Sequence, residues 1–122
     1  NPQIVGTPIT AETAHTITTL LQQSLLEESS DALVEGYSIA GKTGTAEIVV
    51  NGQYSSNQTN ASFVGWGPTD DPQFLVYVWL EKPASSIWGS VVAAPVFSDV
   101  VTQLVVLMNI PPDDMRKSLQ GQ

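Results

Sequence analysis

The chain has 122 residues, 42% of them apolar, and its 4 basic and 12 acidic side chains give a net charge of −8. This length is enough for one domain with a modest core, while the acidic balance disfavours nucleic acid and anionic membrane surfaces as partners. The absence of cysteine excludes disulfides, thiolate chemistry and Cys-based zinc sites.

The first predicted element is a helix from about residue 11 to residue 28. Thr10 is a good N-cap, and Glu12 lies in the first turn, where the helix dipole favours a carboxylate. Apolar residues recur at helical spacing and define one stripe. They are Ala14, Ile17, Leu21 and Leu25. The connection that follows this helix is polar.

Three β-strands are predicted next. The first ends at Asn51-Gly52, the strongest short signal for a β-hairpin, because both central residues of a type I′ turn need positive φ. The polar stretch 55–60 is interpreted as an insert before the second strand. The third strand is apolar without alternation, so we expect cover on both of its faces. The predicted strands are 37–50, 61–67 and 74–80.

The last predicted element is a helix over 91–108, with Pro95 in its first turn, where a missing N–H costs little. Its predicted apolar face consists of Phe97, Val100, Val101, Leu104 and Met108. No apolar stretch approaches the roughly 20 residues of a membrane span, so we expect no membrane contact. The order helix, three antiparallel strands, helix indicates an α+β fold.

One short motif has two possible interpretations. Gly36, four residues, then Gly41-Lys42-Thr43 satisfies the phosphate-loop pattern, and Lys42-Thr43-Gly44 satisfies the K-T-G signature of penicillin-recognising serine enzymes. A phosphate loop needs a helix that begins at the Lys-Thr pair. Strand-like sequence lies on both sides of Lys42 instead, which favours the K-T-G interpretation.

The residue types of this motif suit recognition of a carboxylate. A lysine ammonium attracts the negative charge, and a threonine hydroxyl can hydrogen-bond to it. A glycine on a strand lets a ligand approach the backbone closely. A strand edge also offers N–H groups to a developing oxyanion.

The segment "AGKTGTAEI" resembles the third motif of the penicillin-binding proteins, in particular the high-molecular-mass peptidoglycan transpeptidases. The segments "NASFVGWGP", "FLVYVWLEKP" and "AAPVFSDVV" resemble the next two strands and the start of the terminal helix of that family. The resemblance covers about residues 10 to 110. It implies that residues 1–110 form the C-terminal part of a transpeptidase domain with the β-lactamase-like fold. Residues 111–122 are then a polar tail.

The resemblance also implies roles for four residues. Lys42 belongs to the catalytic proton and electrostatic network, and Thr43 binds the carboxylate of a D-alanyl terminus or of a β-lactam. Gly44 leaves room for the ligand, and Thr45 supplies a backbone N–H to the oxyanion hole. The implied reaction of the parent protein is serine acylation by a D-Ala-D-Ala stem peptide, followed by transfer to an amine. No cofactor and no metal are expected.

The chain departs from the family pattern at its nucleophile. The family uses a serine in S-x-x-K, upstream of K-T-G, but no serine stands three residues before a lysine. Those positions hold Ile39, Trp79 and Asp114, before Lys42, Lys82 and Lys117. The sequence Ser55-Ser56-Asn57 meets the family's S-x-N motif only in a polar hairpin after K-T-G, so we interpret it as chance. We therefore expect an excised piece, opening on Asn1, that is inactive alone.

Several expectations follow for this piece. The parent protein is placed at the extracytoplasmic face of the cell membrane, anchored by another segment. Alternatives are a D,D-carboxypeptidase or β-lactam sensor of the same fold, and a stand-alone non-catalytic module for binding or assembly. His15 is expected to face solvent. In the family fold, strand 74–80 is flanked by N-terminal strands, so we expect its free edge to pair with another copy.

Overall fold

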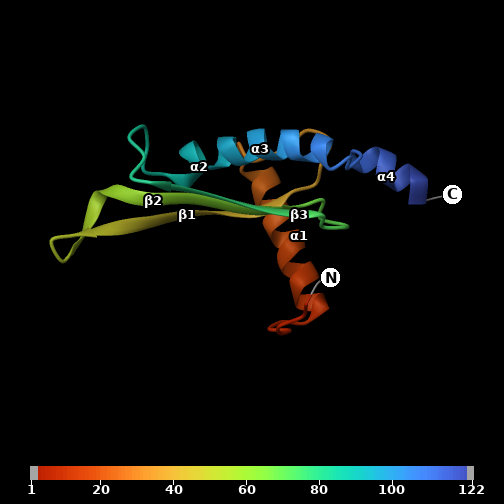
Figure 1. The fold of residues 1–122 in the computed structure, drawn as a ribbon, viewed down its shortest axis with the longest axis horizontal. Helices are drawn as coiled ribbons and strands as arrows, with labels where there is room; N and C mark the ends of the chain where they lie inside the picture. Colours follow the sequence, from red (N-terminus) through yellow and green to blue (C-terminus); the bar gives the residue numbers. More distant parts are fainter. Residues whose placement is uncertain (1–2, 121–122) are drawn as a thin grey trace.

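The computed structural model describes residues 3–120. Residues 1–2 of the predicted transpeptidase segment and residues 121–122 of the predicted polar tail lie outside it. The strands form one antiparallel sheet in the order β1-β2-β3, which confirms the predicted α+β class. Helices α2 and α3 run along one face of the sheet, and α1 crosses the opposite face (Figure 1). The elements are α1 (Ala11–Glu27), β1 (Ala40–Val50), β2 (Gln53–Gly67), β3 (Phe74–Glu81), α2 (Gly89–Val92), α3 (Ala94–Leu107) and α4 (Asp113–Gln120).

Helix α1 begins as the sequence predicts, because the Thr10 side chain accepts a hydrogen bond from the backbone N–H of Thr13 at 3.1 Å. Its apolar stripe, however, is only partly covered, with Ala14 and Leu21 half-buried. Leu25 is the only residue of the helix that is buried, whereas Ile17 is 41% exposed. Two polar contacts fix the helix to the sheet: Trp66 Nε1 donates to Thr18 Oγ1 at 3.3 Å, and Thr69 Oγ1 donates to Gln22 Oε1 at 2.8 Å.

The hairpin between β1 and β2 has the predicted turn, with φ of 52° at Asn51 and 82° at Gly52. The polar insert predicted for 55–60 is wrong, because these residues are part of β2. Thr59 and Asn60 pair with Glu47 and Ala46, and the register shift between Glu47 and Val49 leaves residues 55–58 as an irregularity in the ladder. Polar residues can occupy these positions because Ser56, Asn57 and Gln58 are exposed to solvent, while the buried Thr59 is hydrogen-bonded through its hydroxyl.

The centre of the core is an aromatic pair from β2 and α3. The rings of Phe63 and Phe97 lie 4.7 Å apart between centroids, tilted by 52°. Gly65 makes this packing possible, since a Cβ at that position would lie 2.6 Å from Cζ of Phe97. The aromatic pair therefore fixes α3 on the sheet at one point.

The C-terminal helical segment differs from the prediction in two ways. It is divided at Ala93 into α2 and α3, with Pro95 in the first turn of α3 as expected. The buried line of α3 contains Val101 and Val105 rather than Val100 and Met108, which are 42% and 44% exposed. Apolar residues surround this helix almost completely, so periodicity alone did not define which line meets the sheet.

The run Gly89–Leu107 corrects the expectation about membrane spans. Its 19 residues are long and apolar enough to cross a bilayer by length and composition. Phe97 and Val101 on this run are nevertheless fully buried against the rest of the protein. The run therefore contributes buried residues to the core, while only 28% of its apolar window is buried in the protein.

Strand β3 also corrects an expectation, because only one of its faces is covered. Phe74 is buried, and Val76 and Val78 pack against the core from the same face. The alternate residues Leu75 and Tyr77 are 67% and 60% exposed. The uninterrupted apolar sequence therefore does not reflect burial on both sides in the described residues.

The segment predicted as a polar tail contains an ordered helix, α4. The backbone N–H of Ser38 donates to Asp113 Oδ2 at 2.9 Å, and Arg116 Nη2 lies 2.7 Å from carboxylate oxygens of both Asp70 and Asp113. The hydrogen bond from Arg116 lowers the pKa of Asp70 below its usual value. Together these contacts attach α4 to the segment just before β1 and to the turn between β2 and β3.

Candidate functional site

The K-T-G motif lies on an edge of the sheet. Within the described part of the chain β1 pairs only with β2, with Lys42 opposite Val64 and Gly44 opposite Ser62. The strand continues through the motif, and no helix begins at Lys42-Thr43. A phosphate loop needs that helix start to bind its anion, so the local structure excludes the nucleotide interpretation.

Lys42 and Thr43 bring a positive charge and a hydroxyl group together. Nζ of Lys42 donates to Oγ1 of Thr43 at 3.2 Å and lies 3.4 Å from the carbonyl oxygen of Thr43. Lys42 is exposed and Thr43 is half-buried. An incoming carboxylate would meet both groups at the same point of the strand edge, where it could replace the contact between them.

Gly89 lets helix α2 lie directly against this strand, and Gly44 lets the strand lie close to Ser62 of β2. A Cβ at Gly89 would overlap the carbonyl oxygens of Gly44 and Ser62, and a Cβ at Gly44 would overlap Oγ of Ser62. The backbones therefore approach more closely than any side chain would allow. The N–H of Gly89 donates to Oγ1 of Thr45 at 3.3 Å, so the side chain of Thr45 attaches α2 to β1.

A polar cleft of about 310 Å³ opens beside Thr43. Its other walls are the connection after α1 and the start of α2. The lining residues are Glu28, Ser29, Ser30, Asp31, Thr43, Ser90 and Val91. Sequence reasoning missed this cleft, because residues 28–31 were seen only as a polar connection. The cleft gives a ligand bound at Thr43 a second polar wall.

A larger groove, of about 610 Å³, begins at Thr45 and continues toward the hairpin. The hydroxyl of Thr59 donates to the carbonyl oxygen of Ile87 at 2.6 Å and so holds the loop before α2 against the sheet. The lining residues are Thr45, Ala46, Glu47, Tyr54, Ser56, Thr59, Ile87 and Trp88. This groove could not be predicted from a short motif, because its walls come from three separated segments.

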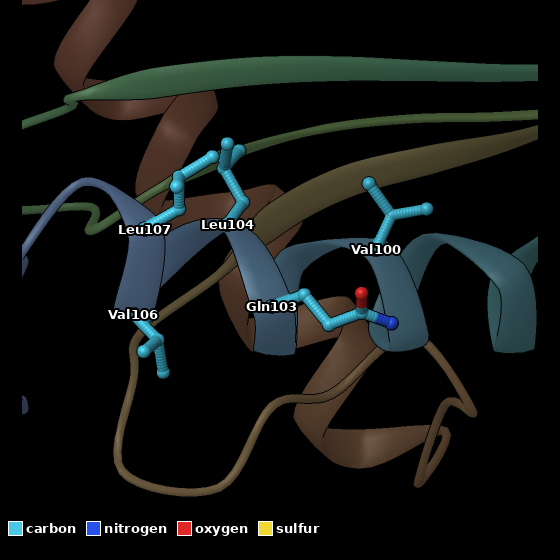
Figure 2. Close-up of a pocket in the computed structure, with 5 residues that line it drawn as sticks. All are labelled: Val100, Gln103, Leu104, Val106 and Leu107. Atoms are coloured by element: carbon cyan, nitrogen blue, oxygen red, sulfur yellow. The ribbon is translucent and has the colours of Figure 1, made fainter.

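An apolar hollow of about 500 Å³ lies on α3, away from these two clefts (Figure 2). Its lining comes from successive turns of one helix, and Gln103 is its one polar side chain. It contains no titratable group, so it cannot supply acid–base or carboxylate chemistry. We regard it as an uncovered helix face rather than as part of the site.

The remaining sequence candidates lie apart from the K-T-G strand. His15 is exposed on α1. Ser55 Oγ donates to Asn57 Oδ1 at 2.7 Å within the hairpin, so the two polar side chains of the S-x-N match bond to each other. Among residues 3–120 no group of three metal-ligating side chains comes together, and Asp70 instead pairs with Arg116.

Comparisons with known proteins point to one family. The family model described as the penicillin binding protein transpeptidase domain matches residues 1–102. Stage V sporulation protein D of Bacillus subtilis is 37% identical over 106 residues, which are 85% of this chain and 16% of that protein. The probable peptidoglycan D,D-transpeptidase PenA of Neisseria flavescens is 36% identical over 80 residues, which are 65% of this chain and 20% of that protein.

Solved structures give the same result. The transpeptidase domain of Burkholderia pseudomallei penicillin-binding protein 3 superposes with a TM-score of 0.75 at 34% identity, over 84% of this chain and 32% of that one. The chain thus spans a fifth or less of these two curated relatives and about a third of this solved domain. With the match over residues 1–102, these findings show that the chain belongs to the penicillin-binding protein transpeptidase family and corresponds to a portion of its transpeptidase domain.

Proposed function

We propose that this chain forms one wall of a peptidoglycan transpeptidase site and binds peptides that end in D-Ala-D-Ala, as well as β-lactams. The observation that carries the proposal is the position of Lys42 and Thr43, side by side on an open strand edge above a polar cleft. Lys42 supplies the positive potential and takes part in proton transfer, and Thr43 hydrogen-bonds the ligand carboxylate.

Gly44 and Thr45 complete the proposed binding edge. Gly44 has no side chain to keep the peptide away from the backbone, and the backbone N–H of Thr45 donates to the oxyanion. The side-chain hydroxyl of Thr45 is already engaged with Gly89. This division supports a role for the main chain of Thr45 rather than for its hydroxyl.

Binding of the carboxylate can be tested with two peptides. Titration of the isotope-labelled chain with N-acetyl-D-Ala-D-Ala should shift the NMR resonances of Thr43, Gly44 and Thr45. The same peptide with its C-terminus amidated lacks the carboxylate and should leave them unchanged. Equal shifts with both peptides would contradict the proposal, because recognition would not depend on the carboxylate.

We further propose that the chain alone does not react covalently with penicillin. No serine stands three residues before a lysine in the 122 residues, so the family's S-x-x-K nucleophile is not supplied by this chain. Incubation with a fluorescent penicillin followed by denaturing electrophoresis should show no labelled band. A labelled band mapped to one of its serines would overturn this proposal.

Two alternatives use the same geometry. A D,D-carboxypeptidase or a β-lactam sensor would bind the same carboxylate, and it differs from a transpeptidase in the fate of the acyl group. A stand-alone non-catalytic module is favoured for the isolated chain by the missing S-x-x-K. A complete protein that transfers an acyl group to an added amine supports the transpeptidase, whereas transfer only to water supports the carboxypeptidase. We place the site outside the cytoplasm, at the face of the membrane where peptidoglycan lies.

We also propose that the isolated chain pairs with a second copy through β3. This strand is an edge in the described sheet, and its unpaired backbone groups can add another strand. Sedimentation equilibrium of the wild type should show a dimer, and Val78→Pro should weaken it by removing one N–H group. A wild type that is folded by circular dichroism and monomeric at millimolar concentration would contradict the pairing.

A further inference from the structure

A short C-terminal segment, residues 110–116, holds the chain just before the K-T-G strand. The hydroxyl of Tyr37 donates to the carbonyl oxygen of Ile110 at 2.8 Å, a contact between residues 73 positions apart. The N–H of Asp113 donates to the carbonyl oxygen of Gly36 at 2.9 Å. The family model matches residues 1–102, so this segment is part of the folded unit although it lies beyond the matched range.

Arg116 joins this segment to a third part of the chain. Its Nη2 atom donates to Oδ1 of Asp113 and to Oδ1 of Asp70, each at 2.7 Å. The other oxygen of Asp113, Oδ2, accepts a hydrogen bond from the N–H of Ser38 at 2.9 Å. The side chains of Arg116 and Asp113 are 10% and 15% exposed, so solvent screens their attraction little. One guanidinium thus fixes the carboxylate that binds the backbone of Ser38.

Ser38 is also fixed by the turn between β2 and β3. The N–H of Thr69 lies 3.1 Å from both the carbonyl oxygen and the hydroxyl oxygen of Ser38. Asp70, the next residue of the turn, is the one that pairs with Arg116. The contacts therefore close on themselves around the start of β1. We call Ser38, Thr69, Asp70, Asp113 and Arg116 the entry clamp.

The entry clamp is close to the K-T-G motif along the chain. Strand β1 begins two residues after Ser38, and Lys42 is four residues after it. Within the described sheet β1 pairs with β2 alone, so one side of the strand has no backbone partner. Among residues 3–120 the ammonium of Lys42 hydrogen-bonds only to Thr43. The place of that ammonium therefore depends on how firmly the backbone of β1 is held.

We infer that Arg116 is a positioning residue for the proposed carboxylate site. Through Asp113 and Asp70 it holds the start of β1, and so keeps Lys42 and Thr43 in the arrangement that receives a ligand. A strand whose start is free must be ordered when the ligand binds, and that cost lowers the affinity. The effect on affinity rests on the proposed function, whereas the effect on the backbone does not.

Amide hydrogen exchange tests the effect on the backbone. In the 122-residue chain, Arg116→Gln removes the charge and keeps a polar side chain. Exchange at Ser38, at Thr69 and at the amides of 39–43 that bond to β2 should rise about tenfold, which corresponds to about 1.4 kcal/mol, near the usual value of a hydrogen bond to a charged group. Amides between β2 and β3 should keep the wild-type rate. An equal rise in both ladders would indicate general destabilisation and would overturn the positioning role.

Two further variants test the charge itself. Arg116→Lys should restore most of the protection, because a single nitrogen makes both contacts and an ammonium can replace it. Lys117→Gln removes the same charge from the next residue, which is exposed and has no ion pair in the described part of the chain, and should exchange as the wild type does. Exchange in Arg116→Lys as fast as in Arg116→Gln would overturn the assignment to the ion pairs.

A milder change covers the case in which Arg116→Gln does not fold, as judged by circular dichroism. Tyr37→Phe removes only the hydroxyl that bonds to Ile110. It should raise exchange at Ser38 about threefold, within the usual value of one neutral hydrogen bond. Unchanged exchange at Ser38 in this folded variant would show that the C-terminal segment does not hold the start of β1.

Peptide binding connects the held strand to the ligand. N-acetyl-D-Ala-D-Ala, titrated by NMR, should bind Arg116→Gln about threefold more weakly than the wild type, and Lys117→Gln equally well. Faster exchange at Ser38 with unchanged affinity would overturn the positioning role and leave the proposed function standing. The absence of any shift at Thr43 in the wild type would overturn the proposed function, and exchange at Ser38 would still decide whether Arg116 holds β1.

Discussion

The two edges of the sheet differ in what lies beside them. At β1, Gly44 has no side chain to cover the backbone, and its carbonyl oxygen lies against Gly89 of α2. At β3 the strand carries large apolar residues, and Leu75 and Tyr77 of one face are exposed. The first edge carries the residues of the proposed carboxylate site, and the second has the composition of a strand that packs against protein.

This difference shows that exposure alone does not identify a functional edge. Both edges offer unpaired backbone groups, but only β1 combines them with a cation, a hydroxyl group and a polar cleft. The β3 edge has no charged side chain until Glu81 at its end. If both proposals hold, the side chains beside an edge decide whether that edge binds a small ligand or pairs with another strand.

The largest expected loss of stability comes from adding a methyl group where α2 lies against β1. Gly89→Ala places a Cβ against the carbonyl oxygens of Gly44 and Ser62, so α2 must move. We expect a loss of about 1–3 kcal/mol in the free energy of unfolding, the usual cost of overpacking, measured by urea denaturation. Gly6→Ala is the matched control, since a Cβ there has no neighbour within 4 Å. Equal stability of both variants would show that α2 does not press on the K-T-G strand.

A smaller effect is expected at Thr45. Thr45→Val removes the acceptor of the Gly89 N–H at nearly constant volume, and the usual net value of such a hydrogen bond predicts a loss of about 1 kcal/mol in unfolding free energy. Thr43→Val should instead leave stability within about 0.5 kcal/mol and weaken binding of N-acetyl-D-Ala-D-Ala. If Thr43→Val lost more unfolding free energy than Thr45→Val, the result would contradict a structural role for Thr45 and a binding role for Thr43.

The ion pair between Asp70 and Arg116 should have a still smaller, pH-dependent effect. The hydrogen bond from Arg116 lowers the pKa of Asp70. The ion pair therefore stabilises the folded protein above the ordinary pKa of 3.8, and this contribution is lost as pH falls below that value. The Asp70 side chain is 39% exposed, so the contribution is at most about 0.5 kcal/mol. Asp70→Asn should flatten stability between about pH 5 and pH 3, measured by denaturation at each pH. Asp71→Asn, with no ion pair in the described structure, is the control and should keep the wild-type pH dependence.

The smallest effect on stability is expected at the β3 face. Trp79 is 51% exposed, so Trp79→Lys should change the free energy of unfolding by no more than about 0.5 kcal/mol. The same change places a charge beside the proposed pairing edge and should lower self-association in sedimentation equilibrium. Tyr54→Lys, at a side chain that is 75% exposed on the hairpin, should leave association as in the wild type.

The features that depend on short-range sequence patterns were predicted correctly. The N-cap at Thr10, the Asn51-Gly52 turn and Pro95 in the first turn of α3 all depend on a few neighbouring residues, and the structure has each of them. The burial of α3 and β3 was predicted less well. Both are apolar on nearly every side, and only the position of the sheet decides which residues are covered.

The candidate site was predictable only in its strand. Lys42 to Thr45 are consecutive residues with a recognisable pattern, so the sequence alone located them. The polar cleft and the groove are formed by segments as distant as Glu28, Glu47 and Trp88. Such walls depend on long-range packing, which a single sequence does not encode in any short motif.

The long hairpin of β1 and β2 has a consequence for how such a protein can diversify. Its tip at Asn51-Gly52 projects away from the helices (Figure 1), and a Cβ at Gly52 would have no neighbour within 4 Å. Insertions and deletions at an exposed tip of this kind are tolerated without disturbing the core. Tyr54 is on this hairpin, whereas Lys42 and Thr43 are on the part of β1 that pairs beside Phe63. The tip can therefore change in length or sequence while Lys42 and Thr43 keep their place in the sheet.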